Sequence, residues 1–323
     1  MSRPAGTELS YDVHGLHLAV VSDDPAVLGA LELRLRGFSV APTGSPGIRL
    51  EYVSGAEEAS PPTGGRPVYE TPHGRLDYVA EHDTLHGRFG GVRLRCAATA
   101  GVAQLNASAF TGRDLYLATH PLATISLMEL LKRRARYPLH AACLATAGGD
   151  GVLIAAPSGS GKSTLAFALA RAGLDFLGDD TVFLDHGAPT GAVSVLGFAD
   201  ALGVTSHTAT SFGELRCDAV GPPPGFPKRL LRLEDVLAVH TVASCTPRLL
   251  VVPEIVHDRP SRLSELDPKE ALLRLVPDVL LTDPTSTQAH LTALAALLAQ
   301  VRCHRLESGP DLEHNARLIT ALL

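Results

Sequence analysis

The chain contains no tryptophan, and aromatic residues make up only 5% of its 323 residues. Proteins that bind single-stranded nucleic acid stack the bases on aromatic side chains, and such a stacking surface is not expected here. An excess of positive charge is also missing, because the formal net charge is −6. Since a nucleic-acid binder normally shows a basic domain or stripe, we expect no nucleic acid among the partners.

Cysteines are few and widely spaced. The five residues Cys96, Cys143, Cys217, Cys245 and Cys303 include no pair at the close spacing of a zinc knuckle or a redox motif. They are expected to be reduced, mostly buried thiols of a cytoplasmic protein. The sequence also lacks a charged N-terminal segment followed by an apolar run, and no stretch approaches ~18 uninterrupted apolar residues. We therefore expect neither a signal peptide nor a membrane span.

The length of the chain suggests two domains, at roughly 150 residues each. Residues 1–137 are expected to form an N-terminal α/β domain of sheet and helices. Val92, Leu94 and Cys96 alternate with polar residues, which predicts strands of a sheet with one solvent-facing side. Further elements expected in this domain are strands at 17–21 and 48–53, a loop at 54–67, a helix at 24–36 capped by Asp23 or Asp24, and a helix at 122–136 ended by Pro138.

Residues 138–323 differ in character and are expected to form the second domain. Between residues 139 and 185, strand, glycine-rich turn, helix and strand alternate, which is typical of a parallel α/β unit. Further elements expected in this domain are a loop at 222–229 (PPPGFPKR), a strand at 249–255, helices at 285–301 and 311–323, and a short strand at 302–307 between these helices.

The segment 151–180, GVLIAAPSGSGKSTLAFALARAGLDFLGDD, indicates the chemistry of the protein. Its apolar run 152–156 is short enough to be a buried strand, a glycine-rich loop follows, and a helix comes next. This strand–loop–helix context is the one that a phosphate-binding loop requires. The expected nucleotide-binding residues are Ser158, Gly159, Ser160, Gly161, Lys162, Ser163 and Thr164.

Each part of this loop has a physical reason. Gly159 and Gly161 let the backbone turn so that N–H groups and the positive end of the helix face one concavity and bind phosphate oxygens. Lys162 supplies a full positive charge to the β- and γ-phosphates, and Ser163 offers a hydroxyl to Mg²⁺. The usual pattern has glycine where this chain has Ala156. The alternative interpretation is a glycine-rich turn that binds no nucleotide.

Two adjacent carboxylates, Asp179 and Asp180, follow the helix of this segment. Such a pair is repulsive unless a cation lies between the two groups, and Mg²⁺ on the β- and γ-phosphates meets that need. The second carboxylate would then accept a proton from an attacking hydroxyl group. The alternative is a capped turn with solvated carboxylates.

The segments LHAACLA (139–145) and APSGSGKSTLAFALARAGLDFLGDD (156–180) resemble the catalytic domain of HPr kinase/phosphorylase and its relatives. Within that family they are most similar to the HPr-kinase-like proteins of peptide natural-product pathways, including lasso-peptide precursor kinases. The resemblance implies an α/β P-loop kinase domain of the HPr kinase / phosphoenolpyruvate carboxykinase type. It is strong over 139–185, looser over 228–323 and weakest over 1–120.

The resemblance also implies roles for individual residues. One of the paired carboxylates would be the catalytic base and the other a metal ligand, and we assign the base to Asp179 and the metal to Asp180 with Ser163. His140 matches a family histidine near the transferred phosphate, and Lys228 matches a lysine of the relatives that would clamp phosphate. The alternative for His140 is an ordinary histidine at the end of a strand, and the alternative for Lys228 is a solvated charge on a loop. The glycine-rich signature of the HPr kinase/phosphorylases proper is not found, so recognition of HPr and the reverse reaction are not implied.

The favoured function is ATP- and Mg²⁺-dependent phosphorylation of a hydroxyl group, on a serine of a peptide or protein or on a small molecule. One alternative is a P-loop ATPase or nucleotide-dependent switch, for which Glu254 at the end of LLVVPEI is a candidate residue. Another is a nucleotide-binding scaffold in a biosynthetic complex. The family includes hexamers, so a homo-oligomer is compatible with the resemblance.

A group of basic residues, Lys132, Arg133, Arg134 and Arg136, lies near the end of the helix expected at 122–136. Cations are favoured there by the helix dipole. The alternative is a docking site for an acidic substrate.

Overall fold

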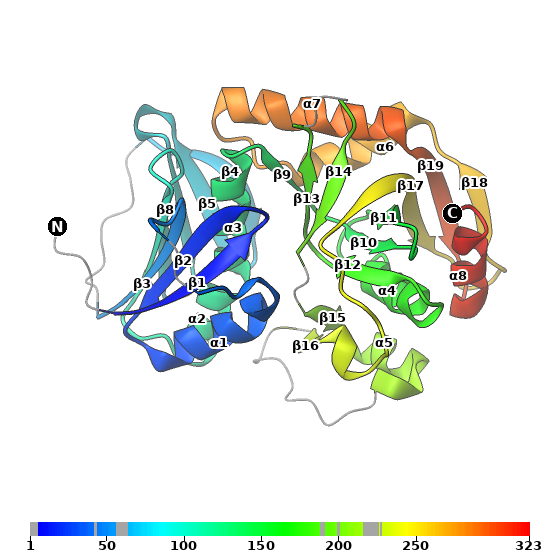
Figure 1. Ribbon diagram of the computed structural model, residues 1–323, viewed down its shortest axis with the longest axis horizontal. Coiled ribbons are helices and arrows are strands. Elements are labelled where there is room, and N and C mark those ends of the chain that lie inside the picture. The colour runs from blue at the N-terminus through cyan, green and yellow to red at the C-terminus, as the bar shows by residue number, and fades with distance from the viewer. Residues whose placement is uncertain are drawn as a thin grey trace. The chain divides into compact units, whose positions relative to one another are not determined.

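The structure, a computed structural model, describes residues 6–41, 44–55, 64–187, 191–198, 201–215, 226 and 228–323. The chain forms two compact units (Figure 1). Unit 1 comprises Met1–Arg134 and Leu280–Gln288, and unit 2 comprises Ala135–Val279 and Ala289–Leu323. The structural division after Arg134 lies close to the boundary expected at 137, but segment 280–288, which was expected in the second domain, packs in unit 1.

Unit 1 is built on an eight-stranded mixed sheet. Its strands are β1 (Thr7–Val13), β2 (Leu16–Ser22), β3 (Ile48–Ser54), β4 (Arg66–Thr71), β5 (Gly74–Val79), β6 (Thr84–Phe89), β7 (Val92–Ala97) and β8 (Val102–Ala107). They lie in the order β1-β2-β3-β8-β7-β6-β5-β4, and β2, β3 and β8 are parallel neighbours. Val92, Leu94 and Cys96 are buried and alternate with more exposed arginines, which confirms the predicted sheet with one solvent-facing side.

Helices of unit 1 cover the buried side of this sheet. They are α1 (Pro25–Leu35), α2 (Gly112–Thr119) and α3 (Pro121–Lys132), with 3-10 turns at Arg36–Phe38 and Ala80–His82. The side chain of Asp24 accepts a hydrogen bond from the Ala26 N–H, which identifies Asp24 as the cap of α1. The expected end of the helix at Pro138 is wrong. The helix ends at Lys132 because Ala135 has a φ of +57°, and Pro138 lies in the next strand.

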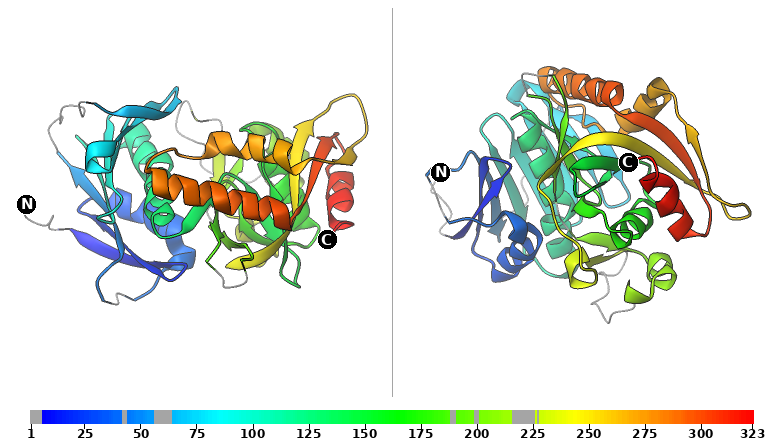
Figure 2. Two further views of the ribbon diagram at one scale, coloured as in Figure 1. Left: turned by 90° about the horizontal axis from the view of Figure 1, so that it is seen from above. Right: turned by 45° about the vertical axis from the view of Figure 1, so that its right-hand side comes forward.

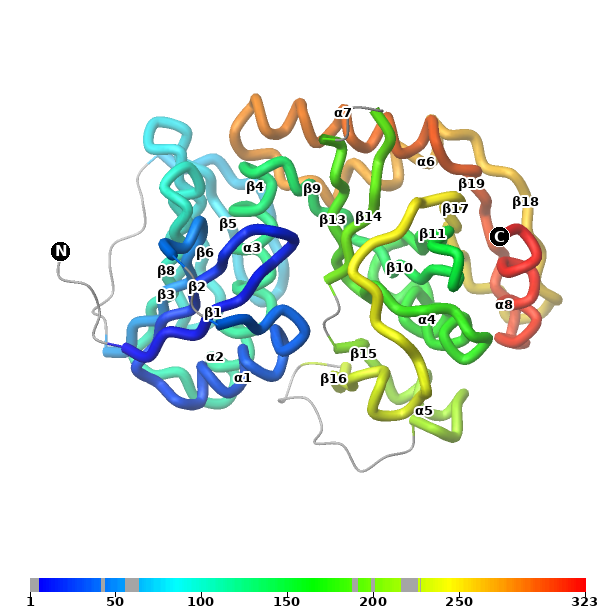
Figure 3. The backbone as a smooth tube through the Cα atoms, in the orientation of Figure 1, coloured from blue at the N-terminus to red at the C-terminus, as the bar shows by residue number. Residues whose placement is uncertain are grey.

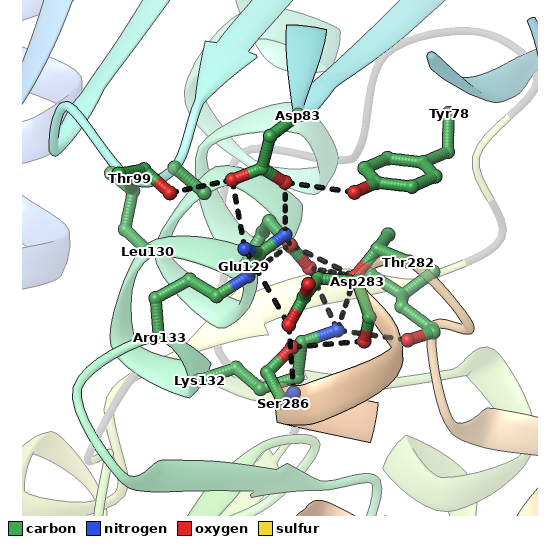
Figure 4. Close-up of polar contacts among 12 residues, drawn as sticks. Tyr78, Asp83, Thr99, Glu129, Leu130, Lys132, Arg133, Thr282, Asp283 and Ser286 are labelled. Carbon is green, nitrogen blue, oxygen red and sulfur yellow. Dashed lines mark hydrogen bonds and ion pairs between the residues drawn. The ribbon is translucent and has the colours of Figure 1, made fainter. Parts of the chain in front are cut away.

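The basic residues at the end of α3 make contacts within the protein and do not form a docking surface. Lys132 is buried, pairs with Glu129 at 2.9 Å, and donates to the Leu280 carbonyl oxygen (2.9 Å) and the Thr282 hydroxyl (2.6 Å). Arg133 binds both oxygens of Asp83 (Figure 4). Arg134 donates to backbone carbonyl groups and Arg136 pairs with Asp185. The network therefore ties segment 280–288 to unit 1.

Unit 2 contains a nine-stranded mixed sheet and a two-stranded ribbon. The strands are β9 (Arg136–Leu139), β10 (Ala142–Ala145), β11 (Asp150–Ile154), β12 (Asp175–Gly178), β13 (Val182–Asp185), β14 (Ser194–Gly197), β17 (Ser244–Ile255), β18 (Arg262–Glu265) and β19 (Arg302–Ser308), and the ribbon is β15 (Leu202–Val204) with β16 (Arg229–Leu231). The order is β12-β10-β11-β17-β14-β13-β9, with β19 also paired to β17 and β18 to β19. Strands β17 and β19 confirm the strands predicted at 249–255 and 302–307.

The parallel unit expected at 139–185 is confirmed in the direction of its strands β11 and β12, but the two strands do not pair directly because β10 lies between them. Strands β10 and β11 are joined by a tight turn and are therefore antiparallel, and β10 is also antiparallel to β12. The parallel partner of β11 is β17, which returns beside it from a distant part of the chain (Figure 3). Strand β19 continues the parallel part on the far side of β17.

Helices lie on both faces of this sheet (Figures 1 and 2). Helices α4 (Lys162–Arg171) and α8 (Leu312–Thr320) pack on one face with Val152 and Ile154, whereas α6 (Pro268–Leu275) and the C-terminal part of α7 (Pro284–Gln300) pack on the other with Leu153 and Ala155. Alternate residues of β11 thus enter two separate cores. Unit 2 also has α5 (Ser206–Ser211) and short 3-10 turns at Gly213–Leu215, Leu233–Asp235 and Val276–Asp278.

The helices predicted at 285–301 and 311–323 are confirmed as α7 and α8. Most of the loops predicted at 54–67 and 222–229 lies outside the described residues. Four of the cysteines are free and buried, as expected, and Cys217 lies outside the described residues. In the part of the chain that the structure describes, no helix is long and apolar enough to cross a membrane.

Candidate active site

The glycine-rich loop lies between β11 and α4, as the sequence predicts. Gly159 and Gly161 both have a φ of +88°, a conformation that side chains with a Cβ rarely adopt, so glycine is required at both positions. Helix α4 begins at Lys162, and no side chain caps its first turn. Its first N–H groups lack intrahelical partners and can therefore bind phosphate oxygens. Ala156 has an ordinary negative φ, so the loop does not need the usual glycine there.

Lys162 lies across the concavity of its own loop. The side chain is only 6% exposed, and Nζ donates to the carbonyl oxygens of Ala156 (2.6 Å) and Pro157 (3.4 Å). It also lies 2.9 Å from Nε2 of His140. Burial lowers the pKa of the Lys162 ammonium group, and the nearby Asp180 partly opposes this effect. The positive charge is therefore held where a phosphate chain on this loop would meet it.

Asp179 lies just beyond the end of β12 and faces the first turn of α4. It is 3% exposed, and its Oδ2 accepts hydrogen bonds from the Ser163 hydroxyl (2.8 Å) and the Gly203 N–H (3.0 Å). The other oxygen, Oδ1, is buried and has no hydrogen-bond partner. Burial and then the charge of Asp180 raise the pKa of Asp179 to about 6. This carboxylate therefore has one oxygen fixed by two donors and one buried oxygen without a hydrogen-bond partner.

His140 connects Lys162 to the second carboxylate. Because the Lys162 ammonium group can only donate, Nε2 of His140 accepts and Nδ1 carries the proton, which it donates to the Asp180 carbonyl oxygen at 2.9 Å. The Asp180 carboxylate lies 3.6 Å from the same Nδ1, and its side chain is 57% exposed. His140 therefore contacts both Lys162 and the turn that carries the two carboxylates.

Lys228 reaches the site through the β15–β16 ribbon, in which Gly203 is opposite Leu230. A Cβ placed on Gly203 would lie 2.9 Å from Cδ of Lys228, 3.5 Å from its Nζ and 3.7 Å from Oδ2 of Asp179. The lysine therefore passes directly over this glycine, next to the buried carboxylate. Gly203 was not predicted as a site residue. The only sequence signal was a glycine inside a short apolar run, which can mark a close approach of backbone and side chain.

Two further residues considered from the sequence, Thr164 and Glu254, have their contacts away from Asp179. Thr164 faces away from Asp179, and its hydroxyl lies 2.9 Å from that of Thr208. Glu254, the residue considered for an ATPase, is paired with Arg274 at 2.9 Å and Arg305 at 3.7 Å. The described residues thus bring Lys162, Ser163, Asp179, Asp180, His140 and Lys228 to one place.

The donor set suits magnesium. Among the described residues no group of three or more His, Cys, Asp or Glu side chains could hold a metal ion on its own. Mg²⁺ is usually bound by one or two carboxylates together with substrate phosphates and water. The Ser163 hydroxyl and the exposed Asp180 carboxylate are oxygen donors of this kind.

No family model matches the sequence, and no curated protein matches it either. Among solved structures, the chain is similar to the Hpr(Ser) kinase/phosphatase from Coxiella burnetii, with 13% sequence identity and a TM-score of 0.28. The match covers 57% of this chain and 92% of that one. A likeness at this TM-score carries no conclusion, so the chemistry of the site rests on its own geometry.

Proposed function

We propose that this protein is an ATP- and Mg²⁺-dependent kinase that transfers the γ-phosphoryl group to a hydroxyl group. The observation that carries the proposal is the hydrogen bond between Ser163, in the first turn after the phosphate-binding loop, and the buried carboxylate of Asp179. A phosphate chain on the loop would be placed directly beside a carboxylate that still has an unpartnered oxygen.

The loop and its lysine would hold the nucleotide. The N–H groups at the start of α4 would bind phosphate oxygens. The Lys162 ammonium group would leave the carbonyl oxygens of its loop and bind the β- and γ-phosphates instead. Ser163 and Asp180 are the side chains that would hold Mg²⁺. When bound, the ion would neutralise negative charge that develops on the phosphates during transfer. Lys228, near Asp179, would place a second cation at the transferred group.

Asp179 is the proposed catalytic base. Its raised pKa of about 6 lies near neutral pH, where a general base is most effective. The acceptor oxygen forms a bond to the γ-phosphorus, the bond between this phosphorus and the β,γ-bridging oxygen breaks, and the proton of the acceptor hydroxyl moves to Oδ1 of Asp179. ADP leaves with the electron pair of the broken bond. His140 would act as a positioning residue, because it contacts both Lys162 and Asp180.

We propose a serine of a peptide or protein as the acceptor, with a small-molecule hydroxyl as the second class. This choice is supported by the resemblance of 139–145 and 156–180 to HPr-kinase-like proteins of peptide natural-product pathways. The ATPase alternative is disfavoured because Glu254 is engaged by two arginines.

The test is phosphate transfer from labelled Mg-ATP to candidate peptides and to an extract of the source cells. Wild type should label an acceptor on oxygen, giving an acid-stable phosphate and a matching increase in mass. Lys162→Ala should bind Mg-ATP weakly in calorimetry, and Asp179→Asn should bind it but transfer no label. Rapid release of inorganic phosphate with no labelled acceptor would instead identify an ATPase. Equal Mg-ATP affinity in wild type and Lys162→Ala would contradict the phosphate-binding loop itself.

A further inference from the structure

A separate cavity opens beside the first turn of α4, away from the paired carboxylates. It has a volume of about 240 Å³, and its walls include Thr164, Leu165, Ile255, His207, His257 and Pro310. Apolar side chains and two imidazole rings thus surround a space that begins at the phosphate-binding loop, since Gly161 also lines it. Pockets for drug-sized molecules usually enclose about 300–1,000 Å³, so this cavity suits a smaller group.

The direction of two consecutive side chains relates the cavity to the catalytic residues. Ser163 donates to Asp179, whereas Thr164 lines the cavity. Successive residues of a helix point about 100° apart, because a turn contains 3.6 residues. A phosphate chain wrapped around the start of α4 would therefore have its reacting end at Asp179 and its other end at the cavity.

The walls of the cavity are fixed by buried hydrogen bonds. Asn315 is fully buried, and its Nδ2 donates to the Ser308 hydroxyl (2.9 Å) and to the Gly309 carbonyl oxygen (3.2 Å). The Val256 N–H donates to the Ser308 carbonyl oxygen, which joins the ends of β17 and β19. The two loops on this side are thus held in place before any ligand binds.

Ile255 is the exposed apolar residue nearest to the loop. It is 47% exposed at the end of the central strand β17, and its Cδ1 lies 3.7 Å from a Cβ placed on Gly161. Ile255 therefore lies next to the loop and also lines the cavity. An apolar side chain presented to solvent beside two imidazole rings is well suited to cover one face of an aromatic base.

We infer that this cavity binds the nucleoside end of the nucleotide, its base and ribose, and thereby selects a nucleoside triphosphate over inorganic polyphosphate. The inference rests on the proposed function, because the loop must first bind phosphate. Ile255 and Leu165 would contact the base, and His207 and His257 offer ring nitrogens to polar groups of the base or ribose.

The test compares Mg-ATP with Mg-tripolyphosphate by calorimetry, since tripolyphosphate occupies the loop but has no nucleoside. Wild type should bind ATP more tightly. Ile255→Ala, which removes an exposed wall of the cavity, should weaken ATP binding about tenfold or more and leave tripolyphosphate binding unchanged. Leu273→Ala is the matched control, because Leu273 is an apolar residue that is 74% exposed on α6 and does not line the cavity. It should change neither affinity.

A second variant fills the cavity instead of enlarging it. Ser211 lines the cavity and is exposed, so Ser211→Trp should block ATP without altering the core or the binding of tripolyphosphate. If wild type binds the two ligands equally and neither variant changes the affinity for ATP, the proposed nucleoside site is wrong. The proposed phosphate-binding loop would then still stand. If wild type binds neither ligand, the phosphate-binding loop and the nucleoside site both fail.

Discussion

Asp179 combines features that rarely favour stability. Its carboxylate is buried beside a second acid, and one of its oxygens has no partner. Burial of a charge without full compensation lowers the free energy of unfolding, and such groups are concentrated at functional sites. Burial of the Asp179 carboxylate is thus expected to cost stability, as is typical of groups at functional sites.

Asp179→Asn should therefore stabilise the protein at neutral pH. The folded-state pKa of about 6 lies above the ordinary value of 3.8, so the native state binds this proton more tightly than the unfolded chain does. The contribution of Asp179 to stability is full below about pH 4 and is lost as the pH rises through about 6. We expect Asp179→Asn to gain about 1–2 kcal/mol at pH 7.5 and almost nothing at about pH 4, measured by urea unfolding.

Asp258→Asn is the control for this measurement, because Asp258 is an exposed aspartate. It should change the free energy of unfolding little at either pH. A loss of stability in Asp179→Asn at pH 7.5 would mean that its hydrogen bonds to Ser163 and Gly203 outweigh the cost of the buried charge.

The two carboxylates should also differ in their dependence on magnesium. Asp180→Asn should raise the Mg²⁺ concentration needed for half-maximal phosphate transfer, because Asp180 is the proposed metal ligand. Asp179→Asn should lower kcat by about a hundred- to ten-thousandfold at saturating Mg²⁺, as expected for loss of a general base. Titration of initial rates against Mg²⁺ separates the two effects. If Asp179→Asn instead raised the Mg²⁺ requirement and Asp180→Asn lowered kcat at saturating Mg²⁺, Asp180 would be the base and Asp179 the metal ligand.

At the scale of secondary-structure elements, the β15–β16 ribbon decides which distant residues join the site. Gly203 on β15 supplies an N–H to Asp179, and the residue before β16, Lys228, passes over that glycine. The ribbon therefore brings a hydrogen-bond donor, the Gly203 N–H, and a cation, Lys228, to Asp179 from a part of the chain that is distant in sequence from the glycine-rich loop.

Gly203→Ala should displace Lys228 without unfolding the protein. The added Cβ would lie 2.9 Å from Cδ of Lys228, and a flexible lysine side chain can move away from it. We expect phosphate transfer to fall to the level of Lys228→Ala, with an unchanged circular dichroism spectrum and melting temperature. Gly213→Ala is the control, because a Cβ there meets nothing within 4 Å. Wild-type activity in Gly203→Ala would show that the position of Lys228 over Gly203 is not needed.

At the scale of the whole molecule, the two units do not follow one another along the chain. Segment 280–288 comes after most of unit 2 but packs in unit 1, where Lys132 contacts both Leu280 and Thr282. Glu129 accepts a hydrogen bond from the Thr282 hydroxyl and is paired with Lys132 and Arg133. This buried charge network thus holds the returning segment.

Lys132→Met should destabilise the protein by about 3–5 kcal/mol, because it leaves Glu129 buried with a lost partner. The double variant Glu129→Gln with Lys132→Met should recover part of that loss, since the carboxylate that lost its buried lysine partner and kept only Arg133 and Thr282 is then neutral. Urea unfolding measures both effects, and hydrogen exchange should show faster opening of 280–288 in the single variant. A single variant as stable as wild type, with unchanged exchange in this segment, would contradict a stabilising role for the network.

The sequence alone determined the features that depend on neighbouring residues. The positive φ of Gly159 and Gly161, the alternation in β7 and the helix that starts at Lys162 are local properties, so pattern and residue type predict them. The candidate residues Lys162, Ser163 and Asp179 lie within eighteen positions of one another, joined by one helix and one short strand, which is why they could be predicted as one site.

Only the tertiary structure decided which distant segments complete these elements. The pairing of β11 with β17, the approach of Gly203 and Lys228 to Asp179, and the return of 280–288 to unit 1 join parts of the chain that are far apart in sequence. Strand pairing and burial depend on how whole faces pack, and many partners satisfy the same local pattern. The basic group at the end of α3 illustrates this limit, because the partners that turn Lys132 into a buried residue include Leu280 and Thr282, and no local pattern indicates them.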